Sequence, residues 1–289
     1  MDQLVTAAAA TTDGIKLGTA VAVLSTDDPI RAFEQLAIAD AIAPGRIDAV
    51  AGRGSSTITF DLFDHDEADY DLLFASKLDL LLTVNTTENI DFAGPHRRKP
   101  LRDNTVYPRP ARPLPIWLGT GGSPNSVIRA AELGVPMFIG ILGGTPQHWA
   151  RYGHAYRHAW TQTGRPAEQS RIAVAVHGFV GPDNTEAKSH LPAPRTRHVR
   201  HRRRRSPTPT HNPDRPRRRP PTRRHGLRRQ PRRNRYRIID PHQVLGHDRQ
   251  ILQMDIGGPH TVHAGTVSPR VFPAVSFSRF GRRASGRRR

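Results

Sequence analysis

The glycine-rich turn at residues 121–123 is the part of the chain best suited to binding chemistry. Gly121, Gly122 and Ser123 follow the apolar residues 116–118 and precede Pro124. Glycine lets a backbone approach a ligand closely, while serine and proline favour the N-cap and the first position of a helix. The free N–H groups of such a helix start suit a phosphate group. A turn whose glycines serve backbone geometry alone is the alternative, because the motif is short.

A second glycine turn follows the apolar residues 47–51 and consists of Gly52, Arg53, Gly54 and Ser55. Its place at the end of an expected strand makes these residues candidates for contacts to a cofactor. A turn that only caps the strand is the alternative. The arginine has a further option, since it could pair with the acidic stretch downstream, which contains Asp64, Asp66 and Glu67.

His177 lies within the apolar residues 172–180 and is the candidate for a catalytic residue. An imidazole titrates near neutral pH and can move protons, but a lone histidine in a strand is more often structural. His65 has no spaced partners for a metal, and His96 is expected to be a solvated loop residue. No Ser-His-Asp order, carboxylate pair or metal-ligand spacing stands out, so the sequence predicts no metal site.

Apolar segments of strand length alternate with segments of helical periodicity. We expect strands at residues 16–24, 47–51, 116–118, 135–141, 172–180 and 249–256, and helices that include residues 3–12, 29–43 and 70–82. The first strand should be buried on both faces, since its apolar run is continuous. Residues 60–69 are expected to form a loop, and residues 85–114 an irregular excursion with a short hairpin around residues 90–96. One helix carries aromatic side chains expected to be core, namely Trp149, Tyr152, Tyr156 and Trp160.

The alternation predicts an α/β fold with a parallel sheet and crossover helices. Glycine turns recur after the expected strands, at residues 52–55, 119–123, 143–144 and 257–258. The carboxyl ends of the strands are where a parallel α/β barrel builds its active site. A doubly wound open sheet has the same alternation, so periodicity does not separate the two architectures.

Charge is distributed very unevenly along the chain. Residues 1–188 contain 17 Lys+Arg and 21 Asp+Glu, whereas the later residues contain 27 arginines and four acidic residues, so the C-terminal part supplies the net charge of +19. Frequent proline and the loss of apolar periodicity predict disorder. The expected division is a partial barrel domain at 1–188, a disordered basic segment at 189–237, a final strand region at 238–260 and a disordered basic tail at 261–289.

The basic segment raises the alternative of nucleic-acid or polyanion binding. Its arginines would bind phosphates with a steep salt dependence. Tyr236 is the only aromatic residue between 189 and 237, so base stacking has little support and we expect non-specific binding only.

The chain contains no cysteine, which excludes disulfides and thiolate chemistry. No apolar run reaches the length of about 18 residues that a transmembrane helix needs. The first residues lack the basic and apolar regions of a secretory signal. We therefore expect a cytoplasmic protein without membrane partners.

Three stretches together resemble the luciferase-like monooxygenase family of flavin- or deazaflavin-dependent enzymes, namely residues 17–55, 113–144 and 245–258. The first is specific: a strand is followed by Asp-Asp-Pro-x-Arg-x-x-Glu, a helix, and a strand that ends in Ala-Gly-Arg-Gly-Ser. The resemblance implies a (β/α)8, or TIM-type, barrel whose open end binds the isoalloxazine ring. It also implies that loops at strand ends hold the cofactor phosphate, which assigns that role to the turn at residues 121–123.

The resemblance further implies an oxidoreductase, a monooxygenase that acts on a small organic substrate with reduced FMN and molecular oxygen. A 5-deazaflavin coenzyme and hydride transfer are the alternative. In such enzymes the cofactor carries the chemistry while the protein orients the reactants and excludes water. Members of the family often associate as homo-oligomers.

Two departures from the family pattern stand out. The chain has six expected strands where the family has eight, and it begins after two strands and a Glu-His-His type motif that family members usually carry. We therefore expect a barrel truncated at the N-terminus, with weak or absent activity. Residues 189–237 and 261–289 are rich in arginine and proline and lack lysine. GC-rich coding sequence that is translated in a wrong frame has this composition, so we hypothesise a frameshift in both segments.

Overall fold

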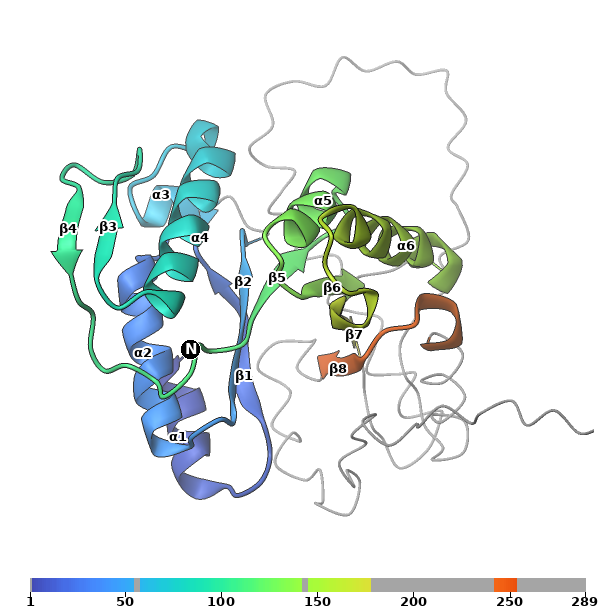
Figure 1. Ribbon diagram of the computed structural model, residues 1–289, viewed down its shortest axis with the longest axis horizontal. Helices are drawn as coiled ribbons and strands as arrows, with labels where there is room; N and C mark the ends of the chain where they lie inside the picture. Colours follow the sequence, from blue (N-terminus) through green and yellow to red (C-terminus); the bar gives the residue numbers. More distant parts are fainter. Residues whose placement is uncertain (1, 55–57, 142–144, 178–241, 254–289) are drawn as a thin grey trace, which may run out of the picture. The chain divides into compact units, whose positions relative to one another are not determined.

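The computed structural model describes residues 2–54, 58–141, 145–177 and 242–253 (Figure 1). The chain divides into two compact units, Met1–Phe138 and Ile139–Arg289. The expected domain boundaries at residues 188, 237 and 260 stay predictions, because residues 178–241 and 254–289 lie outside the described part.

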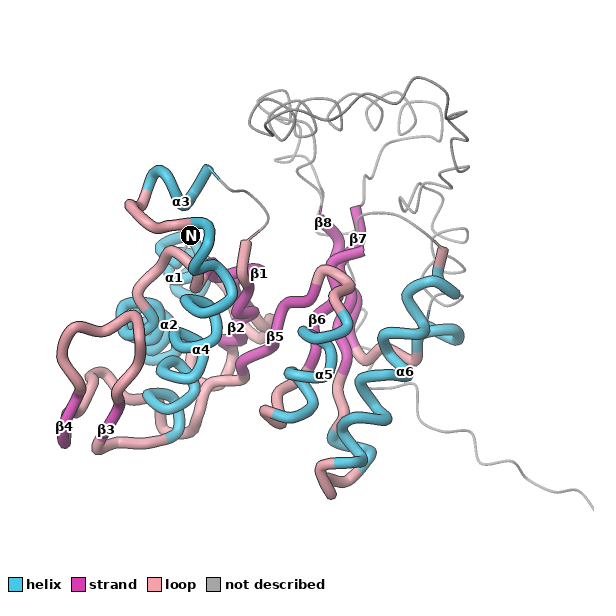
Figure 2. Tube along the Cα trace, turned by 90° about the horizontal axis from the view of Figure 1, so that it is seen from above, coloured by secondary structure: helices cyan, strands magenta, loops and turns pink. Residues whose placement is uncertain are grey.

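The first unit alternates strands and helices in the order that the sequence predicts. Its elements are α1 (Asp2–Thr11), β1 (Leu17–Val23), α2 (Pro29–Ile42), β2 (Ile47–Gly52), α3 (Ile58–Leu62), the 3-10 helix η1 (Glu67–Asp69), α4 (Tyr70–Thr86), β3 (Ile90–Phe92), β4 (Leu101–Asn104), β5 (Ile116–Thr120), α5 (Pro124–Glu132) and the start of β6 (Met137–Ile141). The main sheet has the order β1-β2-β5-β6, and β1 and β5 both pair with β2 in parallel. Figure 2 shows α2 and α4 together on one side of β1 and β2.

Local sequence signals explain the helix starts in this unit. The Asp28 side chain accepts hydrogen bonds from the backbone N–H groups of Ile30 (2.9 Å) and Arg31 (3.0 Å), and Pro29 occupies the first turn. An N-cap aspartate and an early proline both stabilise a helix start. The buried face of α2, with Phe33 and Leu36 almost fully covered, then packs toward the sheet. The predicted helix over residues 29–43 is confirmed.

The expectation that the first strand is buried on both faces is wrong. β2 is buried at all six positions, but β1 is mostly half-buried, and Gly18 and Ala20 are exposed. Among the described strands β1 pairs with β2 alone, so no described strand covers its other edge. An apolar run predicts a buried strand, but it does not reveal whether that strand has one neighbour or two.

The acidic stretch between β2 and α4 is more ordered than the expected loop at residues 60–69. It contains α3 and η1, and the Asp66 side chain caps η1 by accepting from the Ala68 N–H group at 2.8 Å. Phe60 is buried and packs edge-on against Tyr70 at 5.3 Å. The Asp66 cap and the buried Phe60 ring therefore order a segment whose composition indicates a loop.

The excursion at residues 85–114 contains the antiparallel pair β3 and β4. The predicted hairpin is confirmed in kind, but its second strand begins at Leu101, so its loop is longer than expected. This loop carries the basic run His96-Arg97-Arg98-Lys99.

The second unit contains the end of β6, α6 (Pro146–Gln162), η2 (Ala167–Gln169), β7 (Ile172–His177) and β8 (Arg249–Gln253). The strand order is β6-β7-β8, and β7 and β8 are parallel. Three of the four aromatic residues of α6 are buried, namely Trp149, Tyr156 and Trp160, and Tyr152 is half-buried. Their interpretation as helix core is confirmed.

Residues 242–253 are tied to the rest of the second unit by polar contacts. The Arg157 guanidinium donates to the carbonyl oxygens of Leu245 (3.0 Å) and Gly246 (2.5 Å). Asp248 accepts from the Ile172 N–H group at 2.8 Å and pairs with Arg171 at 3.0 Å. The predicted sixth strand is confirmed over residues 249–253.

None of the helices in the described ranges is long and apolar enough to cross a lipid bilayer.

We expect Gly52→Ala to destabilise the first unit by about 1–3 kcal/mol, the usual cost of overpacking. A Cβ atom at Gly52 would lie 2.9 Å from Cβ and Cγ2 of Val21, a β-branched side chain that has little freedom to move. Urea unfolding followed by circular dichroism measures the effect. Gly121→Ala is the matched control, since a Cβ atom there would meet nothing within 4 Å. Equal unfolding midpoints for the two variants would contradict the prediction.

Candidate functional site

Two glycine turns meet at the carboxyl edge of the sheet in the first unit. Gly52 ends β2, and Gly121 follows the last residue of β5. The register pairs Ala51 with Leu118, so the next residues along the two parallel strands, Gly52 and Gly119, are neighbours. Both turns therefore lie at the same edge, where parallel sheets place their binding sites.

The turn after β5 has the geometry of an anion site. Gly122 has φ +89°, a left-handed conformation that favours glycine. Ser123 has N-cap backbone angles, but its side chain makes no capping hydrogen bond. Space is open beside Gly121, where a Cβ atom would meet nothing within 4 Å. The serine hydroxyl and the N–H groups of the first turn of α5 are thus free to bind an oxyanion.

Arg53 does not pair with the acidic loop, so that expectation is wrong. Its guanidinium forms an ion pair with Asp71 at 2.5 Å, lies over the Tyr70 ring and donates to the Ser126 hydroxyl at 3.2 Å. Asp71 and Tyr70 both belong to the first turn of α4. Because Ser126 belongs to the first turn of α5, Arg53 positions this helix start and adds positive charge near it.

The rest of the second turn is also held by contacts within the chain. Gly54 has φ +78°, and its carbonyl oxygen accepts a hydrogen bond from the Tyr70 hydroxyl at 2.9 Å. Ser55 lies outside the described residues. The cofactor contacts expected for Gly52, Arg53, Gly54 and Ser55 stay predictions.

An apolar side chain borders the two turns. The Val21 side chain lies beside Gly52 and Gly119, and a Cβ atom at Gly119 would be 3.3 Å from Cγ1 of Val21. Missing side chains at the two glycines let Val21 lie across the backbones of β2 and β5. Such a surface can stack against the face of an aromatic ring, so the edge offers both a ring surface and a phosphate turn.

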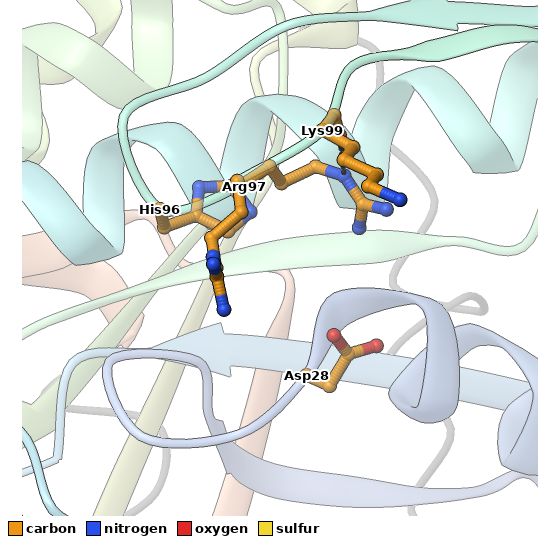
Figure 3. Close-up of a pocket in the computed structure, with 5 residues that line it drawn as sticks. Asp28, His96, Arg97 and Lys99 are labelled. Atoms are coloured by element: carbon orange, nitrogen blue, oxygen red, sulfur yellow. Dashed lines mark hydrogen bonds between the residues drawn. The ribbon is translucent and has the colours of Figure 1, made fainter.

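The structure also reveals a pocket that the sequence interpretation missed. It has a volume of about 620 Å³ and is lined by Asp28, His96, Arg97, Arg98 and Lys99 (Figure 3). The start of helix α2 forms one wall of the pocket, and the loop between β3 and β4 forms the other. The run of four basic residues was the available signal, but nothing in the sequence shows that it faces residue 28.

His96 is not the solvated loop residue that the sequence indicated. Its Nδ1 atom lies 2.7 Å from the Ser76 hydroxyl oxygen, and its Nε2 atom is buried without a partner in the described part of the chain. Burial lowers the pKa of His96, and the positive charges of Lys77 and Arg97 lower it further against the effect of Asp28. The imidazole is therefore neutral at pH 7.

His177 is the last described residue of β7 and stands opposite Gln253 in the β7–β8 register. It thus belongs to the second unit, at the carboxyl end of a parallel strand. Its catalytic role stays a prediction. Across the described ranges no group of three or more His, Cys, Asp or Glu residues could hold a metal ion.

The model of the family described as luciferase-like monooxygenase matches residues 3–262. The chain belongs to the luciferase-like monooxygenase family. The resemblance found in the sequence is therefore confirmed. Uncharacterized protein y4vJ of Sinorhizobium fredii (strain NBRC 101917 / NGR234) is 24% identical over 180 residues, which cover 62% of this chain and 51% of that protein. The chain thus spans about half the length of this curated relative.

Solved structures of other proteins share the fold. Monooxygenase RslO1 from Streptomyces bottropensis has a TM-score of 0.69 at 21% identity, over 87% of this chain and 74% of its own. An F420-dependent secondary alcohol dehydrogenase in complex with an F420-acetone adduct has a TM-score of 0.58 at 15% identity, over 66% of this chain and 58% of its own. The oxygenating constituent of 3,6-diketocamphane monooxygenase from Pseudomonas putida, in complex with FMN, has a TM-score of 0.53 at 18% identity, over 66% of this chain and 56% of its own.

These structural neighbours of the chain are thus flavin- and F420-dependent oxidoreductases. The expected fold class is confirmed: the chain is an α/β protein with six strands of an incomplete TIM-type barrel in its main sheet.

Proposed function

We propose that this member of the luciferase-like monooxygenase family binds FMN, with the cofactor phosphate on Gly121, Gly122 and Ser123 and the ring against the surface formed by Val21, Gly52 and Gly119. The observation that carries the proposal is the uncapped Ser123 hydroxyl at the start of α5, beside the open space at Gly121. The neighbour that was solved with FMN supports this choice. A 5-deazaflavin coenzyme is the alternative, supported by the F420-dependent neighbour.

The residues of the site have separate roles in this proposal. Ser123 and the first amides of α5 bind the phosphate, and the helix N-terminus adds favourable charge. Arg53 orients α5 through Ser126 and so fixes the phosphate turn. A catalytic role for His177, which belongs to the second unit, is a separate proposal. When bound, the cofactor would supply the redox chemistry, with molecular oxygen for a reduced flavin or by hydride transfer for a deazaflavin.

The proposed substrate is a small organic molecule, and the proposed reaction is its oxygenation. We expect binding without appreciable turnover, because residues 189–237 carry no apolar periodicity from which a barrel helix and strand could form. Non-specific binding of polyanions by this arginine-rich segment is proposed as a separate property, since arginine clusters bind phosphates regardless of fold.

Titration of the full chain with FMN, riboflavin and F420 tests the proposal. Quenching of flavin fluorescence reports binding, and about 0.5 M NaCl suppresses the salt-sensitive contribution of the arginine-rich segment. We expect saturable binding of FMN that persists at this salt concentration and is tighter than that of riboflavin. Tighter binding of F420 would favour the alternative cofactor, and loss of all three at high salt would refute the proposed site.

A further inference from the structure

The pocket lined by Asp28, His96, Arg97, Arg98 and Lys99, here called the basic pocket, is separate from the phosphate turn. It shares no residue with Gly121, Gly122 or Ser123, and it begins at α2, after β1, rather than at α5. Its volume of about 620 Å³ lies in the range of small-molecule binding sites. The proposed function leaves this cavity unused.

The basic pocket carries uncompensated positive charge. Arg97, Arg98 and Lys99 take part in none of the ion pairs that the described residues form, and the Arg97 guanidinium makes only a long hydrogen bond of 3.4 Å to the Lys99 carbonyl oxygen. The Asp28 carboxylate, on the opposite wall, already accepts two backbone N–H groups as the cap of α2. Three free cations therefore face one carboxylate that is engaged elsewhere, and concave basic surfaces attract anions.

Further polar groups belong to the same region, because the charge of Lys77 acts on His96. Lys77 is 6% exposed, and its ammonium group, which has three N–H donors, donates one hydrogen bond to the Ser25 carbonyl oxygen at 3.1 Å. The Nε2 atom of His96 is buried and lacks a hydrogen-bond partner within the described residues. If Nδ1 accepts the proton of the Ser76 hydroxyl, Nε2 carries hydrogen and is a donor. Buried donors of this kind are normally paired, so an unpaired one points to a missing acceptor.

We propose that the basic pocket binds the oxyanion group of a small-molecule substrate, a carboxylate, sulfonate or phosphate. Arg97 and Arg98 supply planar forks that bind two oxygens at once, and Lys99 adds a point charge. The neutral imidazole of His96 donates from Nε2. Calling the bound molecule a substrate rests on the proposed function, whereas the binding of an oxyanion does not.

Lysine footprinting tests this site in the full chain. The protein has four lysines, Lys16, Lys77, Lys99 and Lys188, so acylation by an N-hydroxysuccinimide ester can be followed at each by mass spectrometry. We expect saturating pyrophosphate to slow acylation of Lys99 at least about threefold, because bidentate anion binding covers the ammonium group. Lys16 is exposed and lies far from Lys99 in the sequence, so its acylation rate should not change. An unchanged rate at Lys99 would overturn the proposal.

A charge-matched pair of variants separates the pocket from the arginine-rich segment. Arg97→Gln/Arg98→Gln should abolish the protection of Lys99, whereas Arg203→Gln/Arg204→Gln, with the same loss of charge, should retain it. Protection that survives the first variant would overturn the assignment. Arg98 is exposed, so the single variant Arg98→Gln, which should weaken protection, serves if the double variant fails to fold.

Flavin titrations distinguish failure of this inference from failure of the proposed function. The Arg97→Gln/Arg98→Gln variant should keep the FMN affinity of the parent chain. If FMN protects Lys99 as well as pyrophosphate does and riboflavin does not, the pocket holds the cofactor phosphate and not a substrate, which would overturn the proposal. Lys99 protection without any flavin binding would uphold the oxyanion site and refute the cofactor.

Discussion

Gly121→Asp should weaken FMN binding by about 100-fold, since a carboxylate placed within a few ångströms of a phosphate dianion costs several kcal/mol before screening. The new side chain fits, because a Cβ atom at this position meets nothing within 4 Å. It also places negative charge beside the N-terminus of α5, which repels an anionic ligand while it stabilises the helix. Fluorescence titration of the variant and the parent chain measures the ratio of dissociation constants.

Riboflavin, which lacks the phosphate, is the matched ligand for this experiment. Its affinity should change less than about threefold, because the ring surface at Val21 is unaltered and only the phosphate interaction is lost. Gly121→Ala is the matched variant, which adds a methyl group without charge and should bind FMN nearly as the parent does. An equal loss for FMN and riboflavin would show that Gly121 does not lie beside the phosphate.

The stability of the second unit should fall by about 3 kcal/mol as the pH is lowered from 7 to below 4, through the titration of His247. Burial lowers the pKa of this histidine to about 4, with His242 and Arg157 acting in the same direction and the hydrogen bond to Gln250 and the charge of Asp248 opposing it. The unfolded chain, with the ordinary value of 6.5, binds the proton first. The stabilisation is therefore complete above pH 6.5 and is lost as the pH falls toward 4.

Hydrogen exchange in residues 242–253 follows this loss, because the Asp248 N–H group donates to the Ile172 carbonyl oxygen at 2.7 Å next to His247. Carboxylates titrate in the same pH range, so the comparison with His247→Gln is decisive. That variant should show a pH dependence shallower by about the same 3 kcal/mol. His154→Gln, an exposed histidine of α6, should keep the parent dependence. Identical profiles for all three proteins would refute the role of His247.

Local sequence signals were sufficient for most of the elements. Asp28 with Pro29, and Ser123 with Pro124, mark helix starts because a cap and an early proline act within a few residues. The continuous apolar runs of β2 and β5 mark strands for the same local reason. The prediction of a loop for the acidic stretch before α4 was wrong, because the ring contact between Phe60 and Tyr70 helps to order this stretch. Amino-acid composition does not show such contacts.

The sequence by itself determined the family and the order of strands and helices, since each depends on neighbouring residues. Only the tertiary structure decided the partners of Arg53, the edge position of β1, and the basic pocket. In that pocket Asp28 and His96 come from segments that are separated by dozens of residues in the chain. Contacts of this kind form when the sheet brings the carboxyl ends of its strands together. The sequence alone does not show which of these distant residues lie close in space.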